Sequence, residues 1–220
     1  MEDTITDTNV HPPIDHYCAA VFELTEDRIP TSQSNIAKRL GISRTSVFEM
    51  LNRLEKEDII IKDKNITLTK KGLTHAKKIV AKHRLAERFL AEVMKLSWEE
   101  AHSEAGKWEH VISSTVQTRM EEMLGDPATC PRGNPIPGKA EVSKDERSLS
   151  ELLEDQEFTV TRITESIETI PGELTRLYVH NVVPKAKGKV ISIIDGEFKI
   201  EIAGKKVLIP IDSAKELKVI

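Results

Sequence analysis

Two short amphipathic segments separated by Gly41, Ile42 and Ser43 constrain the fold of this chain more than any other feature. Thr31 or Ser32 can cap a first short helix, and Gly41 can end it. The apolar positions of that helix are Ile36, Ala37 and Leu40. Ser43 can cap the following helix, whose buried stripe would consist of Val47, Met50, Leu51 and Leu54. This spacing predicts a helix-turn-helix.

The neighbouring segments extend the helix-turn-helix into a larger module. Residues 14–25 have apolar groups at helical spacing and predict a preceding helix. Residues 58–69 contain two β-rich runs around an Asp-Lys-Asn turn, which predicts a small hairpin with Lys62 and Lys64 at its tip. Helices followed by a hairpin in this order are typical of a winged helix.

The charge distribution suits a surface that binds phosphate groups. Residues 28–84 contain fourteen Lys and Arg against five Asp and Glu, whereas residues 119–170 contain six against twelve. A basic winged helix indicates DNA binding, although a solvated lysine-rich surface has the same composition.

The second helix of a helix-turn-helix enters the major groove with its amino-terminal half. The candidate contacts to bases and phosphates are therefore Ser43, Arg44, Thr45, Ser46 and Glu49, with Lys62 and Lys64 from the hairpin. For Ser43 and Thr45 the alternative is a capping or solvent-exposed role.

The middle of the chain continues as helices. Residues 69–94 predict a long helix, and residues 97–124 predict a further helical region that starts with the capping box Ser97 and Glu100. Residues 125–150 hold four prolines and three glycines before they turn polar, which predicts a domain exit followed by a linker.

The last third of the chain changes to short β patterns. Residues 156–220 contain four such runs, and Gly196 and Gly204 separate the last three. We expect a small SH3-like β barrel, with residues 171–181 as its one helical piece. The predicted fold class is therefore mainly α, with a winged helix-turn-helix, a helical middle domain and this barrel.

Several classes of protein are excluded by what the sequence lacks. It has no apolar run of about 18 residues that could span a membrane. Its first thirteen residues are acidic and polar, unlike a secretion signal, so we expect a cytoplasmic protein. Cys18 and Cys130 are far apart and form no CxxC motif, which argues against a disulfide framework or a zinc knuckle. An enzyme is disfavoured because HExxH, a nucleophile elbow and a phosphate loop are missing.

Histidine and glutamate residues cluster on the two middle helices. His83 and Glu87 are spaced i, i+4 and share one helix face, a pattern that is most often a solvated ion pair. The nonapeptide "HSEAGKWEH", residues 102–110, adds two histidines and two glutamates around Gly106. Imidazole and carboxylate ligands together suit first-row divalent metals, so two such patches on consecutive helices favour a metal site.

The run "HRLAERFLAEVMKLSWEEAHSEAGKWEHVIS", followed by "GNPIPG", resembles the metal-dependent repressors of the diphtheria-toxin-repressor (DtxR and iron-dependent regulator) family. The resemblance covers nearly the whole chain. It implies a homodimer that binds double-stranded DNA at a near-palindromic operator and has no membrane partner. The domains are then a winged-helix DNA-binding domain at 1–75, a helical dimerisation and metal-binding domain at 76–138, a linker at 139–155 and an SH3-like (FeoA-like) domain at 156–220.

The resemblance implies two metal sites in each subunit. Its ancillary site maps to His83, Glu87, His102, Glu165 and Glu168, although the last two could also be a pair of exposed acids. Its primary site maps to His16, Gly106, Glu109 and His110. Gly106 stands where iron-sensing relatives carry cysteine and manganese-sensing relatives carry an acid. His16 replaces the usual methionine or aspartate.

Gly106 offers no side chain, so its carbonyl, with water or Cys18, would have to complete the primary site. On a regular helix Cys18 would point away from His16.

The function implied is a metal-activated transcriptional repressor that senses Fe(II) for metal homeostasis. A Mn(II)-responsive regulator of the same family is the first alternative, and Co(II), Ni(II) or Zn(II) would also bind in vitro. A constitutive winged-helix protein with a decayed primary site is the second alternative.

Overall fold

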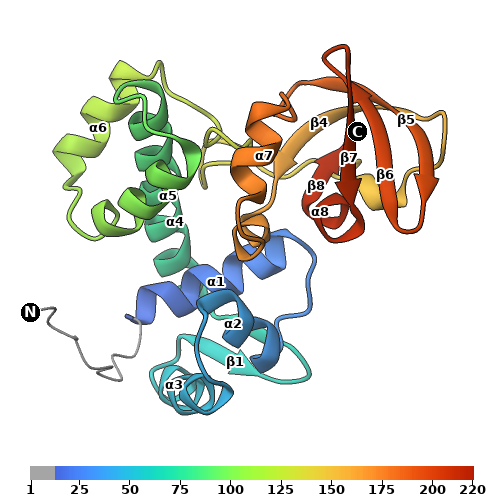
Figure 1. The fold of residues 1–220 in the computed structure, drawn as a ribbon. Coiled ribbons are helices and arrows are strands. Elements are labelled where there is room, and N and C mark those ends of the chain that lie inside the picture. The colour runs from blue at the N-terminus through green and yellow to red at the C-terminus, as the bar shows by residue number, and fades with distance from the viewer. Residues whose placement is uncertain (1–12) are drawn as a thin grey trace, which may run out of the picture. The chain divides into compact units, whose positions relative to one another are not determined.

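The computed structural model describes residues 13–220, which divide into two compact units between Ala76 and Lys77 (Figure 1). Residues 1–12, on which the expectation about a secretion signal largely rests, lie outside the described residues. Among residues 13–220, every helix is too short or too polar to cross a membrane.

The first unit contains the predicted winged helix. Its elements are α1 (Ile14–Glu26), α2 (Gln33–Leu40), α3 (Arg44–Lys56), β1 (Ile60–Lys62), β2 (Ile66–Leu68) and the start of α4 (Lys70–Glu92). Ser32, rather than Thr31, caps α2 by accepting a hydrogen bond from the backbone N–H of Asn35. Gly41 ends that helix in the left-handed conformation, with φ of 65°. The predicted stripe of α3 is buried in the core of this unit.

The hairpin is held against the start of α4 at a close approach that only glycine permits. Strands β1 and β2 pair antiparallel, with Ile60 opposite Leu68. The Thr69 hydroxyl accepts a hydrogen bond from the backbone N–H of Gly72, which orders the first turn of α4. A Cβ atom at Gly72 would lie 2.1 Å from the carbonyl oxygen of Ile59, so any larger residue there would displace the hairpin.

The second unit begins with a helical layer made of the rest of α4, α5 (Trp98–Trp108) and α6 (Ser114–Met123). Its core consists of Leu85, Ala86, Leu90, Ala101, Ala105, Ile112, Met120 and Ile136. The capping box of Ser97 and Glu100 is present, as predicted. The predicted helical region 97–124 is interrupted at 109–113, because Ser113 caps a new helix. This interruption leaves Glu109 and His110 at the carboxyl end of α5.

An antiparallel sheet forms the rest of the second unit (Figure 1). Its strands are β3 (Arg147–Ser148), β4 (Glu157–Ile163), β5 (Lys187–Ile194), β6 (Glu197–Ile202), β7 (Lys205–Pro210) and β8 (Leu217–Val219), in the order β3-β8-β4-β5-β6-β7. Short helices complete it: η1 (Leu149–Glu151), η2 (Glu165–Thr169), α7 (Glu173–Val179) and α8 (Ile211–Glu216). The sheet is SH3-like, but β3 and β7 do not pair within residues 13–220, so it is not a closed barrel.

Part of the predicted linker, 139–155, is folded into this sheet. Arg147 pairs with Val219, and Leu149 and Leu152 are buried in the sheet's core. Glu146 accepts hydrogen bonds from the guanidinium of Arg162 on β4 at 2.8–3.2 Å. The sheet domain therefore begins near residue 146 rather than at the predicted 156.

Candidate metal and DNA-binding sites

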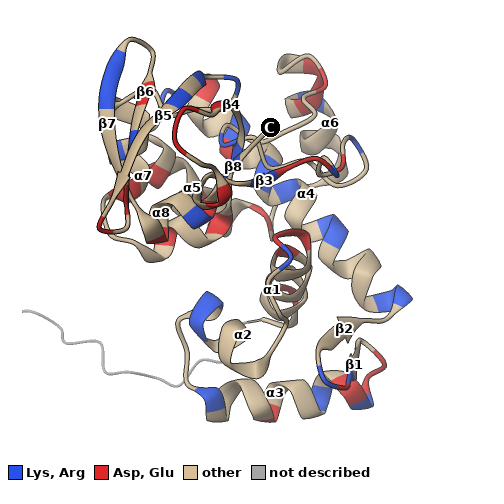
Figure 2. Cartoon of the chain, turned by 90° about the vertical axis from the view of Figure 1, so that its right-hand side faces the viewer, with Lys and Arg blue, Asp and Glu red and all other residues tan. Residues whose placement is uncertain are grey.

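Five of the seven predicted DNA contacts lie at the cap or in the amino-terminal half of α3, and Lys62 and Lys64 lie on the hairpin. The hydroxyl of Ser43 accepts a hydrogen bond from the backbone N–H of Ser46 at 3.1 Å, so Ser43 has the capping role that the sequence left open. Arg44, Thr45 and Glu49 are exposed. Arg44 donates to the hydroxyl of Ser34 on α2 at 2.8 Å, which holds its guanidinium over the helix-turn-helix. Figure 2 shows basic residues at both ends of α3.

Phe48 is a residue of this surface that the sequence analysis did not single out. Its side chain is 52% exposed on α3, although a large aromatic group normally gains free energy by burial. The Lys62 ammonium lies 5.7 Å from the centre of the Phe48 ring and 3.1 Å from Glu55. Lys62 therefore packs on α3, whereas Lys64 is exposed at the hairpin tip. An aromatic residue outside the buried stripe of α3 was the signal that could have found Phe48.

The five predicted ancillary ligands come together within the second unit. His83 and Glu87 come from α4, His102 from α5, and Glu165 and Glu168 from η2. The Nδ1 atom of His102 lies 2.8 Å from Glu87 Oε1, and its Nε2 atom lies 2.8 Å from Glu168 Oε2. His83 Nε2 lies 3.0 Å from His102 Nδ1. The alternative that Glu165 is exposed is wrong, because it is buried, and Glu168 is half-buried.

Arg132 lies in the middle of this cluster, and no sequence motif pointed to it. Its side chain is 2% exposed. Nη2 donates to Glu87 and to Glu165, Nη1 donates to Glu168, and Nη2 lies 3.4 Å from His102 Nδ1. The guanidinium thus contacts all three carboxylates that would have to bind an ancillary metal.

A second buried arginine and an amide support the same carboxylates. Arg84 is fully buried, donates to the carbonyl of Pro135 at 2.6 Å and lies 3.4 Å from Glu165 Oε1. Asn134 donates to Glu165 at 3.2 Å and to the carbonyl of Ile163 at 2.9 Å. The cluster is therefore a network of paired buried charges.

The network shifts the pKa values of Glu87, His83 and His102 toward their charged forms. Burial by itself would raise the pKa of Glu87, but the charges of Arg132 and His83 hold it well below its usual value. Burial would lower the pKa of His83, but Glu87 and Glu109 hold it well above its usual value. Against the same effect of burial, hydrogen bonds to Glu168 and Glu87 raise the pKa of His102 to about 9.

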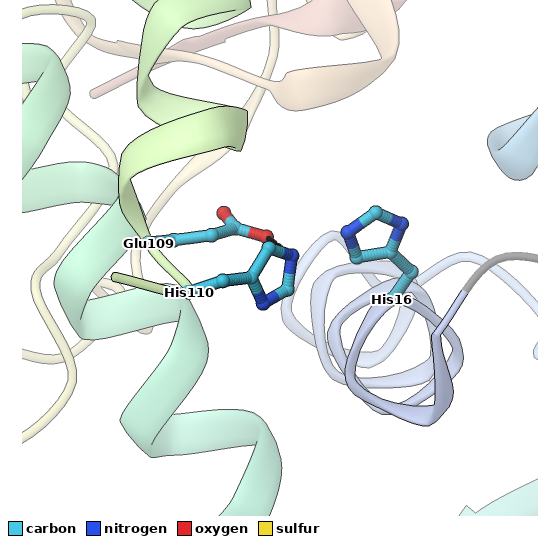
Figure 3. A group of neighbouring side chains, drawn as sticks. All are labelled: His16, Glu109 and His110. Carbon is cyan, nitrogen blue, oxygen red and sulfur yellow. Dashed lines mark ion pairs between the residues drawn. The ribbon is translucent and has the colours of Figure 1, made fainter. Parts of the chain in front are cut away.

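Glu109 links this network to the predicted primary site. It is 6% exposed and accepts a hydrogen bond from His83 Nδ1 at 2.6 Å. Its other oxygen lies 3.3 Å from Nε2 of His110, whose position at the end of α5 Figure 3 shows. His16, also labelled there, is half-buried on α1 of the first unit. Cys18 is buried in the core of that unit, and burial followed by the charge of Asp15 raises its pKa to about 12, which disfavours the thiolate.

The fold and these sites define a class: a winged-helix DNA-binding protein with a histidine and carboxylate cluster in its second unit. Residues 10–66 match the iron dependent repressor N-terminal DNA binding domain, and residues 69–138 match the iron dependent repressor metal binding and dimerisation domain. The chain belongs to the iron-dependent repressor family, which confirms the predicted membership.

Individual relatives cover almost the full chain. The iron-dependent repressor IdeR of Mycobacterium tuberculosis is 35% identical over 217 residues, covering 92% of this chain and 94% of the relative. The diphtheria toxin repressor of Corynebacterium diphtheriae is 27% identical over 202 residues, which cover 91% of this chain and 84% of that repressor. The solved structure of a manganese-dependent transcriptional repressor in complex with manganese superposes on this chain with a TM-score of 0.85 at 25% sequence identity. The match covers 94% of this chain and 99% of that repressor.

The chain is thus a metal-dependent transcriptional repressor, with a DNA-binding domain and a dimerisation domain, and not an enzyme. DNA and a second copy of the chain are its partners.

We predict that raising the pH destabilises the metal-free protein through His102. Its folded pKa, about 9, lies above the usual value of 6.5. The stabilisation is therefore full below pH about 6.5 and is lost as the pH rises through about 9. Urea unfolding with a chelator should show this loss, and His102→Gln should reduce it. An identical pH dependence in wild type and H102Q would contradict the prediction.

We predict that Gly106→Ala stabilises the protein by about 1 kcal/mol, because alanine favours a helix interior more than glycine does. Gly106 lies within α5, and a Cβ atom there would meet nothing within 4 Å. Urea unfolding of the metal-free protein measures the change. Gly72→Ala is the matched control and should destabilise, since its Cβ would clash with Ile59. A lower free energy of unfolding in G106A than in wild type would disprove this prediction.

Proposed function

We propose that the chain is a homodimeric repressor that Fe(II) activates for binding to a near-palindromic operator. The observation that carries this proposal is the Glu109 and His110 pair at the end of α5, within a region that matches a metal-binding and dimerisation domain. Carboxylate and imidazole are competent ligands for Fe(II). Relatives named as iron-dependent cover most of the chain and favour iron. Mn(II) is the alternative activating metal, because a repressor of similar fold has been solved with manganese bound.

The proposed primary site uses His16, Glu109, His110 and the carbonyl of Gly106, with water completing the coordination. The bound metal would supply a positive charge that holds the side chain of His16, and with it α1, in one arrangement. Since α1 packs in the core that also holds α3, this restricts the recognition helix. A preference of about 3 kcal/mol for the DNA-competent state shifts the populations on the order of a hundredfold.

The operator can be obtained from random-sequence duplexes selected with the Fe(II)-loaded protein under anaerobic conditions. Binding of the labelled duplex is then titrated with Fe(II), with Mn(II) and with a chelator. Tighter binding with metal supports the proposal, and the metal that acts at the lower free concentration identifies the better activator. Equal affinity under chelator excludes metal activation.

We predict that His110→Ala removes most of the metal-dependent gain in operator affinity, because it removes a proposed ligand. His180→Ala is the matched control, since it removes a histidine of the second unit outside both clusters. Fluorescence anisotropy with and without Fe(II) measures both variants. A constitutive protein with a decayed primary site would instead show H110A and wild type with the same operator affinity under both conditions.

We also predict that Phe48 contacts the methyl group of a thymine in the operator. An exposed aromatic ring on a recognition helix gains apolar contact there, and burying one methyl-sized group is worth about 0.8 kcal/mol. Replacing single thymines with deoxyuridine removes the methyl group alone. One such replacement should weaken binding of the wild type and leave Phe48→Ala unaffected.

The control for the deoxyuridine experiment is Ile61→Ala, which truncates another exposed apolar residue of the same unit. It should keep the wild-type response to deoxyuridine. If F48A and wild type respond alike at every thymine, Phe48 does not read the operator.

A further inference from the structure

The ancillary site of the family requires one divalent cation among donors that here already surround an arginine. One donor atom from each of Glu87, His102, Glu165 and Glu168 can be chosen so that all lie within 4.8 Å of one another. The donor types would suit a metal. The Arg132 guanidinium, however, hydrogen-bonds to all three of those carboxylates and lies 3.4 Å from the imidazole.

We infer that Arg132 replaces the ancillary metal, so that this chain carries a built-in cation where the family pattern implies a second metal ion. The two ends of the guanidinium fork connect α4 to η2 through Glu87, Glu165 and Glu168. A planar fork with several donors suits this arrangement, and it stays protonated at every pH the protein meets. The helical layer and the sheet are thereby clamped without a metal.

The backbone around Arg132 fixes the guanidinium in the cluster. Its carbonyl accepts a hydrogen bond from the backbone N–H of Ile163 at 2.9 Å, and the flanking turn closes through Cys130 N–H to Asn134 O at 2.9 Å. Gly133 has φ of 90°, and a Cβ atom there would lie 2.3 Å from the carbonyl of Thr161. Gly133 therefore allows the turn to pack closely on β4, which positions the Arg132 side chain to contact Glu165 and Glu168 of η2.

Displacing Arg132 for a metal would be unfavourable. The guanidinium is buried with Glu87 and Glu165, and a divalent ion at the same carboxylates would repel it. Glu87 Oε2 is buried and has no hydrogen-bond partner among residues 13–220, so it is the ancillary donor atom that the network leaves unpaired. One oxygen does not make a metal site.

The test is the metal stoichiometry of the full-length protein, measured by calorimetric titration with Co(II) and by elemental analysis after equilibrium dialysis. Wild type should bind one ion per subunit, and Arg132→Ala should bind two, because removing the guanidinium frees the five donors. The metal should also raise the Tm of R132A more than that of wild type. Arg88→Ala is the matched control; it removes a neighbouring arginine that bonds to the carbonyls of Thr129 and Cys130, and should keep one ion.

A second variant tests the inference without removing a buried charge. Glu168→Gln changes a half-buried ancillary donor, and it should leave the wild-type stoichiometry at one ion per subunit. Two ions in wild type, with one lost in E168Q, would overturn the role of Arg132. An unchanged stoichiometry in folded R132A would also overturn it.

The proposed primary site is tested separately by His110→Ala, which should lower the stoichiometry of wild type from one to zero. If wild type binds no ion while R132A binds one, the primary site fails and the inference about Arg132 stands.

Discussion

The ion pairs between Arg132 and the carboxylates of Glu87, Glu165 and Glu168 hold the second unit together. Taking a carboxylate out of water costs several kcal/mol unless a cation and hydrogen bonds replace the water. Arg132, in a turn, and Arg84, on α4, supply these cations to Glu165. Glu165 is the first residue of η2, which follows β4 in the chain. The sheet and the helical layer are therefore joined by charge pairing as well as by apolar contact, such as Trp98 on Tyr178.

The same network fixes the orientation of Glu109. His83 contacts Glu109 through Nδ1 and lies 3.3 Å from Glu87 through Nε2, so one imidazole joins the clamp to the end of α5. A ring held at both nitrogens has a defined orientation, as a metal ligand's supporting shell requires. A carboxylate held in this way is preorganised, because its position does not depend on a bound ion. Through His83, the Arg132 network therefore positions Glu109 for the proposed primary site.

The sequence predicted local structure better than it predicted the buried polar network. Caps such as Ser32 and Ser97 depend on neighbours within three residues, and the α3 stripe depends on helical period alone. The ancillary donors came from the family resemblance. Arg132 was missed because its partners lie 30 to 45 residues away along the chain, and nothing local distinguishes it from a loop arginine. β3, α8 and β8 were missed because they are short and are stabilised by pairing with distant strands.

In the proposed primary site, the absence of a side chain at Gly106 would leave charge, rather than ligand softness, to select the metal. A thiolate or a carboxylate at this position would add a negative charge, and a Cβ atom at Gly106 would meet nothing within 4 Å. Without it, Glu109 is the only anionic side chain of the proposed primary set. Glu109 already shares its charge with His83, whose pKa is raised well above its usual value by its carboxylate partners against the effect of burial. A metal that binds Glu109 must therefore compete with the positive charge of His83, and metal binding and proton release at His83 are thermodynamically linked.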